Sequence, residues 1–141
     1  MSSDSHEPIE IVGIDTSRVG TPRNDGTAGS ALYAVPIKLS RTPSREWADS
    51  FPEAWNHPPQ FTTMHRPGIA RVSGDSIILD GTTVEEVRDY HAKTLSLVVA
   101  RLNEAEERYR AEQAAKRQRE TQQRAKHEQN VRQVADETQF E

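Results

Sequence analysis

Four short segments in the first 80 residues alternate hydrophobic and polar positions, at least in part, and each predicts a β-strand. They are residues 8–15, residues 31–40, the pair Ala70 and Val72, and the pair Ile77 and Leu79. Pro36 interrupts the second segment. Because proline has no backbone N–H for a sheet ladder, it places this strand at a sheet edge or predicts a bulge there.

A first helix is predicted between the second and third strands. Thr42 is a suitable N-cap, and Pro43 fits the first helical position. Aromatic residues recur at every fourth position, so they share one face of this helix and are expected in the core: Trp47, Phe51 and Trp55. Pro52 predicts a break or a restart of the helix just before it.

The third and fourth strands meet at Gly74-Asp75. Glycine in the first central position of a two-residue loop is typical of a type II′ hairpin. A helix start follows directly. Thr82 and Thr83 are each followed three residues later by a glutamate, so the sequence predicts a capping box in either register.

The last third of the chain predicts one long helix, from about Thr83 to near Glu128. Its apolar stripe has spacings of three and four: Val84, Val87, His91, Leu95, Val98, Leu102, Ala105 and Tyr109. From there to about residue 130 the helix has no apolar face, and glutamates precede cations by four residues. These pairs are Glu104–Arg108, Glu106–Arg110, Glu112–Lys116, Glu120–Arg124 and Glu128–Arg132. Such a helix is roughly 65–70 Å long, so it is expected to project beyond its own domain.

Together these elements predict an α+β fold. The order is β-β-α-β-β-α, with one antiparallel sheet, helices on one of its faces and a long projecting C-terminal helix. We expect a disordered tail at 1–7, a head domain at 8–109, a solvent-exposed helical extension at 110–130 and a C-terminal tail at 131–141.

Composition narrows the classes of protein. Only 33% of the residues are hydrophobic, and the shortage falls in the last third of the chain. Cysteine is absent, which excludes disulfides, thiolate metal sites and a cysteine nucleophile. No apolar run is long enough for a membrane helix, and the polar N-terminus does not resemble a signal peptide. We therefore expect a cytoplasmic protein without a membrane partner.

Charge is uneven along a chain whose formal net charge is −4. Residues 113–127 carry one glutamate, Glu120, against a set of cations: Lys116, Arg117, Arg119, Arg124 and Lys126. A basic segment on an otherwise acidic chain can contact nucleic acid or an acidic partner, or it can be a solvated helix face.

One short motif raises the question of catalysis. Gly74 to Ile77 resembles the Gly-Asp-Ser block that carries the nucleophile in a class of esterases. No Asp-x-x-His follows to supply a base, so we assign Ser76 to the hairpin. His57 and His65 lack the paired spacing of a metal site. His91 is expected to be a core histidine that bonds to the backbone. The sequence therefore predicts no catalytic residue, metal or cofactor.

The favoured function is a noncatalytic assembly module that binds protein partners or a second copy of itself. Tyr90 and Leu97 lie seven residues apart on the helix face opposite the apolar stripe and are candidate partner contacts. A C-terminal peptide with apolar residues could dock into a neighbour: Val131, Val134 and Phe140. The alternative is a nucleic-acid accessory protein that uses the cations of residues 113–127. A small hydrolase, with Ser76 and His57 or His65, is the least supported hypothesis.

Overall fold

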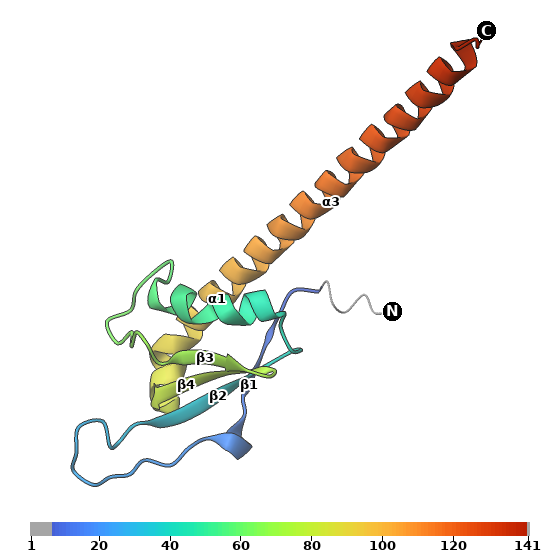
Figure 1. Ribbon diagram of the computed structural model, residues 1–141. Coiled ribbons are helices and arrows are strands. Elements are labelled where there is room, and N and C mark those ends of the chain that lie inside the picture. Colours follow the sequence, from blue (N-terminus) through green and yellow to red (C-terminus); the bar gives the residue numbers. More distant parts are fainter. Residues whose placement is uncertain (1–6, 141) are drawn as a thin grey trace. The chain divides into compact units, whose positions relative to one another are not determined.

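The computed structural model describes residues 7–140, so the predicted disordered tail lies, except for Glu7, outside the described residues. The strands are β1 (Ile11–Ile14), β2 (Tyr33–Leu39), β3 (Ala70–Ser73) and β4 (Ser76–Thr82). The helices are η2 (Thr16–Arg18), α1 (Arg45–Asn56), α2 (Val84–Glu86), the π-helical turn η3 (Val87–His91) and α3 (Ala92–Glu137). This order confirms the predicted β-β-α-β-β-α fold with a long C-terminal helix (Figure 1).

The chain divides into two compact units between Glu104 and Ala105. We call residues 7–104 the head and residues 105–137 the helical segment. Helix α3 belongs to both, because it continues without interruption across the division. The division was predicted five residues later, between Tyr109 and Arg110.

The head is built on a four-stranded antiparallel sheet in the order β1-β2-β4-β3. Ile37 pairs with Ile77 and Val35 pairs with Leu79, so these four side chains share one face of the sheet. The core on that face also holds the predicted aromatics of α1 and apolar residues of α3: Trp47, Phe51, Trp55, Leu95, Val98 and Leu102. Both helices therefore cover the same face of the sheet, as predicted.

The prediction that Pro36 places its strand at a sheet edge, or causes a bulge there, is wrong. Strand β2 is an inner strand between β1 and β4. The Pro36 carbonyl accepts a hydrogen bond from the Asp15 N–H, one residue beyond the end of β1. The Pro36 nitrogen, which has no hydrogen to donate, therefore lies opposite Asp15, where the β1–β2 hydrogen-bond ladder has already ended. The neighbouring irregularities of the ladder lie elsewhere, at Tyr33/Ala34 and at Ile11/Gly13.

Helix α1 starts later than predicted and has no break. Ser44 is its N-cap, and its side chain accepts a hydrogen bond from the Trp47 N–H at 3.2 Å. Pro52 lies inside the continuous helix. A proline in a helix interior costs about 3 kcal/mol. Complete burial of large side chains such as Phe51 and Trp55 stabilises the helix by roughly 1.5–3 kcal/mol each, which outweighs that cost.

The hairpin predicted at Gly74-Asp75 is confirmed. Ser73 pairs with Ser76 across a two-residue loop, and Gly74 has a φ of +60° while Asp75 keeps an ordinary φ. This combination matches a type II′ turn. The turn is fastened to β2, because the Asp75 carboxylate lies 2.7 Å from the Lys38 ammonium.

Two boundaries of the long helix differ from the prediction. The buried stripe ends at Leu102, whereas Tyr109 is 62% exposed and Ala105 is also exposed. The helix continues to Glu137 instead of ending near Glu128, so most of the predicted C-terminal tail is helical. Residues 129–137 contain no glycine or proline that would stop a helix.

Candidate functional site

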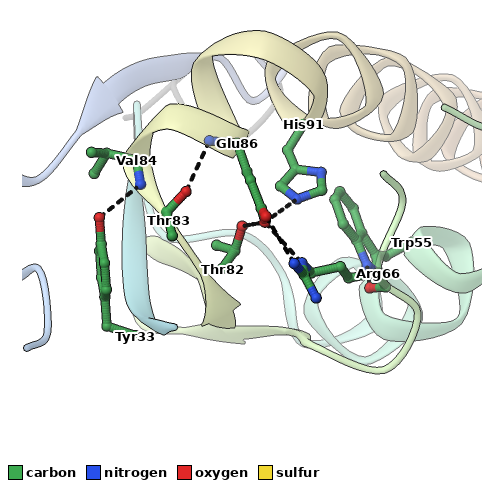
Figure 2. Close-up of polar contacts among 8 residues, drawn as sticks. All are labelled: Tyr33, Trp55, Arg66, Thr82, Thr83, Val84, Glu86 and His91. Atoms are coloured by element: carbon green, nitrogen blue, oxygen red, sulfur yellow. Dashed lines mark hydrogen bonds and ion pairs between the residues drawn. The ribbon is translucent and has the colours of Figure 1, made fainter. Parts of the chain in front are cut away.

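The most elaborate polar cluster of the head lies where β4 leads into the long helix (Figure 2). Thr83 caps the helix by accepting the Glu86 N–H at 3.1 Å. The Glu86 carboxylate does not complete a capping box. It accepts two hydrogen bonds from the Arg66 guanidinium, each at 2.8 Å, and one from the Thr82 hydroxyl at 2.7 Å. Glu86 therefore joins three parts of the chain: the loop after α1, strand β4 and the helix start.

This arrangement makes Glu86 a strong acid. The hydrogen bonds from Arg66 are the main cause that lowers the pKa of Glu86 to about 2, with Thr82 contributing in the same direction. Burial opposes the shift. Glu86 is therefore a carboxylate at neutral pH and cannot act as a proton donor there.

Trp55 is the centre of the adjacent aromatic layer. Its indole N–H donates to the Arg66 carbonyl at 2.8 Å. The His65 ring packs against Trp55 at a centroid distance of 4.6 Å. The His91 ring meets Trp55 edge-on at 5.4 Å (Figure 2). The loop that carries His65 and Arg66 is thus anchored to α1 and to the helix start together.

His91 is buried, as predicted, but it does not bond to the backbone. Among residues 7–140, neither ring nitrogen has a hydrogen-bond partner, and a carboxylate oxygen of Glu86 lies 3.8 Å from Nε2. Burial is the main cause that lowers the pKa of His91, opposed by the charge of Glu86. Burial likewise lowers the pKa of His65, opposed by the Trp55 backbone. Both rings are neutral at pH 7, so they pack against Trp55 without a charge to desolvate.

His91 lies at the end of the π-helical turn Val87–His91. A π turn inserts one extra residue and rotates the following side chains relative to an α-helix. Val87 and His91 are both buried inside this turn. Such turns often occur at functional sites, and this one ends at the histidine whose ring edge meets Trp55.

The residues of the hydrolase hypothesis do not come together as a catalytic set. Ser76 is fully buried in β4, and its hydroxyl has no hydrogen-bond partner in the described part of the chain. His57 is exposed at the C-cap of α1, and His65 packs on Trp55. A serine nucleophile needs a base within hydrogen-bond reach, which Ser76 lacks. Within residues 7–140 no three metal-ligating side chains are grouped to hold a metal ion.

A small cavity opens on the face of the long helix that carries the predicted partner residue Leu97. Its volume is about 40 Å³, and it is formed between the loop after α1 and the first turns of α3. Leu97 lines it, whereas Tyr90, seven residues earlier, is more than one-third exposed. Phe61 is 61% exposed and forms another part of the cavity wall.

The helical segment has two different faces. All residues from 114 to 140 are exposed, so the predicted contacts Val131, Val134 and Phe140 and every cation of the basic segment are accessible. At 100° per residue, the charged residues between 111 and 129 fall on one half of the helix. The other face is uncharged: Ala111, Ala114, Ala115, Gln118, Thr121, Gln122, Ala125 and Gln129. We call this set the uncharged face.

None of the helices in the described part of the chain is both long enough and apolar enough to cross a membrane. Comparisons with protein-family models, with curated proteins and with solved structures found no match for this chain. The arguments about function therefore depend on the geometry of the chain itself.

Sequence reasoning missed the role of Arg66. It lies in a loop without periodicity, and its partner Glu86 was assigned to a capping box. No local pattern signals this contact, because Glu86 stands at the position that a capping box with Thr83 would also require. Sequence reasoning also missed Asn103, whose side chain bonds to both backbone groups of Ile9 and to the Trp47 indole.

Proposed function

We propose that this chain is a noncatalytic protein-interaction module whose helical segment pairs with a helix of a partner protein. The observation that carries the proposal is the segregation of residues 111–129 into a charged half and an uncharged face, all of it within an exposed helix. Just before this stretch, Glu106 and Arg110 pair along the helix at 3.7 Å, and charged residues four apart stabilise an exposed helix locally.

The uncharged face suits close packing against another helix. Alanine side chains let two helix backbones approach, and glutamine and threonine side chains can bond across the interface. Charges on the flanks of such a face favour one orientation and partner over others. The head supports the segment, because α3 is anchored there by the burial of Leu95, Val98 and Leu102.

Two matched double variants test the proposal in the full chain. Gln118→Glu with Gln122→Glu places two charges on the uncharged face, and Gln113→Glu with Gln123→Glu makes the same change within the charged half. Partners captured by the unaltered chain are identified by mass spectrometry, and self-association is measured by sedimentation equilibrium.

We expect the first variant to lose its partner or its self-association by at least tenfold, because two carboxylates would be buried at the interface. The second variant should retain binding. Equal binding by both variants would contradict pairing through the uncharged face, and equal loss would show that added negative charge alone is responsible.

Nucleic acid is the second candidate partner. Lys116, Arg117, Arg119, Arg124 and Lys126 are exposed and lie within one half of the helix. If these cations neutralise phosphates, the logarithm of the association constant for duplex DNA should fall with the logarithm of the salt concentration, with a slope of up to about −4.5. Fluorescence anisotropy with a labelled duplex measures this slope. Replacing Arg117 and Arg124 by alanine should reduce the magnitude of this slope by about two. An unchanged slope would reject nucleic acid as the partner.

A further inference from the structure

Six residues of the uncharged face have the spacing of a coiled-coil seam. They recur at alternating intervals of four and three residues, and we call them the seam: Ala111, Ala115, Gln118, Gln122, Ala125 and Gln129. An interval that averages 3.5 residues keeps side chains in line when two helices wind around each other. All six are exposed on helix α3. The seam is therefore a line along which a second helix can pack.

The seam is complementary to its own reversed copy. In an antiparallel pair of copies centred on residue 120, Ala115 of one copy lies opposite Ala125 of the other. Gln118 lies opposite Gln122 in the same arrangement. Alanine pairs let the two backbones approach, and a glutamine amide can both donate to and accept from a facing glutamine. The contact therefore buries no charge along its seam.

Charged residues along one edge of the seam are complementary under the same reversal. Glu112, Arg119 and Lys126 follow this edge at intervals of seven residues. In the antiparallel pair, Glu112 of each copy lies beside Lys126 of the other, which gives two ion pairs related by symmetry. Neither residue is ion-paired within residues 7–140, so both charges are available. Arg119 meets its own counterpart at the centre, and this single contact between like charges opposes association.

A parallel pair of copies lacks this complementarity. In that orientation an edge residue of one helix meets the other edge of its partner, five residues further along. Glu112 then lies beside Glu107 of the second copy, and Arg119 lies beside Ala114. No ion pair of opposite charges forms across residues 111–129. The distribution of charge therefore selects the antiparallel orientation.

We infer that the partner of the uncharged face is the same face of a second copy of this chain, antiparallel and centred on residue 120. The inference rests on the proposed function and names the partner of that same surface. The seam residues form the contact, and two Glu112–Lys126 pairs fix its register. Because the contact extends over only about 28 Å of each helix, we expect a dissociation constant in the micromolar range.

Introduced cysteines test the orientation in the full chain, which has no cysteine of its own. An Ala115→Cys variant and a hexahistidine-tagged Ala125→Cys variant are mixed in a glutathione redox buffer, so that each disulfide product has its own mass. We expect mainly the mixed disulfide, because each cysteine faces that of the other variant. Variants that crosslink chiefly to themselves would overturn the inference. So would crosslinking no greater than that of Gln113→Cys mixed with Gln123→Cys, two positions outside the seam.

Charge exchange tests the register, with dissociation constants from sedimentation equilibrium of the full chain. Glu112→Lys or Lys126→Glu alone should weaken association at least fivefold, because two attractive contacts become repulsive. The double variant restores opposite charges and should associate within twofold of the unaltered chain. The matched exchange is Glu120→Lys with Lys116→Glu, away from the seam, where each single change should alter association less than twofold. A double variant as weak as the single variants would overturn the pairing.

The contact between like charges at the centre gives a test in the opposite direction. Arg119→Gln should strengthen association at least twofold, because it removes the repulsion between the two copies. Arg117→Gln is the control, since it removes the same charge from a position away from the seam. If the two variants associate equally, Arg119 does not meet its counterpart and the inference is overturned.

Sedimentation also separates the failure of this inference from the failure of the proposed function. A chain that stays monomeric, yet loses a captured partner when Gln118 and Gln122 are replaced by glutamate, would overturn the second copy and retain pairing through the uncharged face. If neither self-association nor partner capture depends on that face, both proposals are overturned.

Discussion

The head and the helical segment share helix α3 but hold their structure by different means. In the head, one side of α3 is buried against the sheet, with Leu95 and Val98 almost inaccessible to solvent. In the segment, every residue from 114 to 137 is exposed. The same helix is therefore stabilised by tertiary burial in its first turns and by local interactions in its later ones.

This difference teaches how an exposed helix of such length can persist. An isolated helix must form its first turn at a high entropic cost. The segment avoids that cost, because it continues a helix that the head has already ordered as far as Leu102. It then needs only residues with good helix propensity and favourable charged pairs, each of which contributes about 0.2–0.5 kcal/mol.

The sharpest contrast is expected from removing an aromatic ring on each side of the division. Trp55 is fully buried, bonds to the Arg66 carbonyl and contacts both His65 and His91. Trp55→Ala should destabilise the head by about 3–5 kcal/mol. Tyr109→Ala, at a position 62% exposed, should change stability by less than about 0.5 kcal/mol. Urea unfolding followed by circular dichroism measures both, and similar losses would contradict the division.

A smaller loss is expected from the polar cluster. Glu86→Gln removes the charge that pairs with Arg66, and hydrogen bonds to charged groups contribute about 1.5–3 kcal/mol. Glu85→Gln is the matched control, because Glu85 is exposed in the same helical turn. It should cost less than about 0.5 kcal/mol. If the two variants unfold at the same urea concentration, Glu86 does not fasten the loop to the helix.

Acid should weaken the head in two steps with different causes. His65 and His91 have lowered pKa values in the folded chain, so the unfolded chain binds their protons more readily. Stability should therefore decline as the pH falls below the ordinary histidine pKa of about 6.5. The Glu86 contribution is present above about pH 4.5 and is lost as the pH falls towards 2.

The variant His91→Leu should flatten the first of these steps and leave the second. Groups that face His91 are Glu86, Arg66 and His65, and all three remain in the variant. Unfolding free energies at pH 7, 6 and 5 test the first step, and those at pH 4 and 3 test the second. An unchanged slope between pH 7 and 5 would show that His91 does not titrate with unfolding.

The smallest effect on the head is expected from the largest deletion. Truncation after Tyr109 removes most of the helical segment but none of the buried core. The melting temperature of the head should change by less than about 2 °C, while binding through the uncharged face should be lost. A melting temperature that falls by about 4–8 °C, equivalent to roughly 1 kcal/mol in a domain of this size, would show that the head depends on the segment.

The sequence by itself determined most of the fold. The spacing of Trp47, Phe51 and Trp55 placed them on one buried face, because a helix brings every fourth residue to the same side. The alternation of Ile77 and Leu79 and the glycine at Gly74 determined a hairpin, since only certain residues fit the φ of a type II′ turn. The segregated charges of residues 111–129 are likewise a property of the sequence and the helical period.

Only the tertiary structure decided how single polar residues are used. Glu86 could have closed a capping box with Thr83, but Arg66 approaches from a distant loop and offers two charge-assisted hydrogen bonds. The cavity beside Lys93 likewise exists only because that loop lies against α3.

Pro36 and Asn103 show why the sequence could not settle these choices. Proline is unfavourable in an inner strand, yet Pro36 is accommodated because β1 ends one residue before its missing donor would be needed. Asn103 follows the last buried residue of the stripe, and it binds Ile9, 94 positions earlier in the chain. Hydrophobic periodicity is local and can be counted along a chain, whereas a hydrogen bond depends on which distant atoms folding brings within about 3 Å.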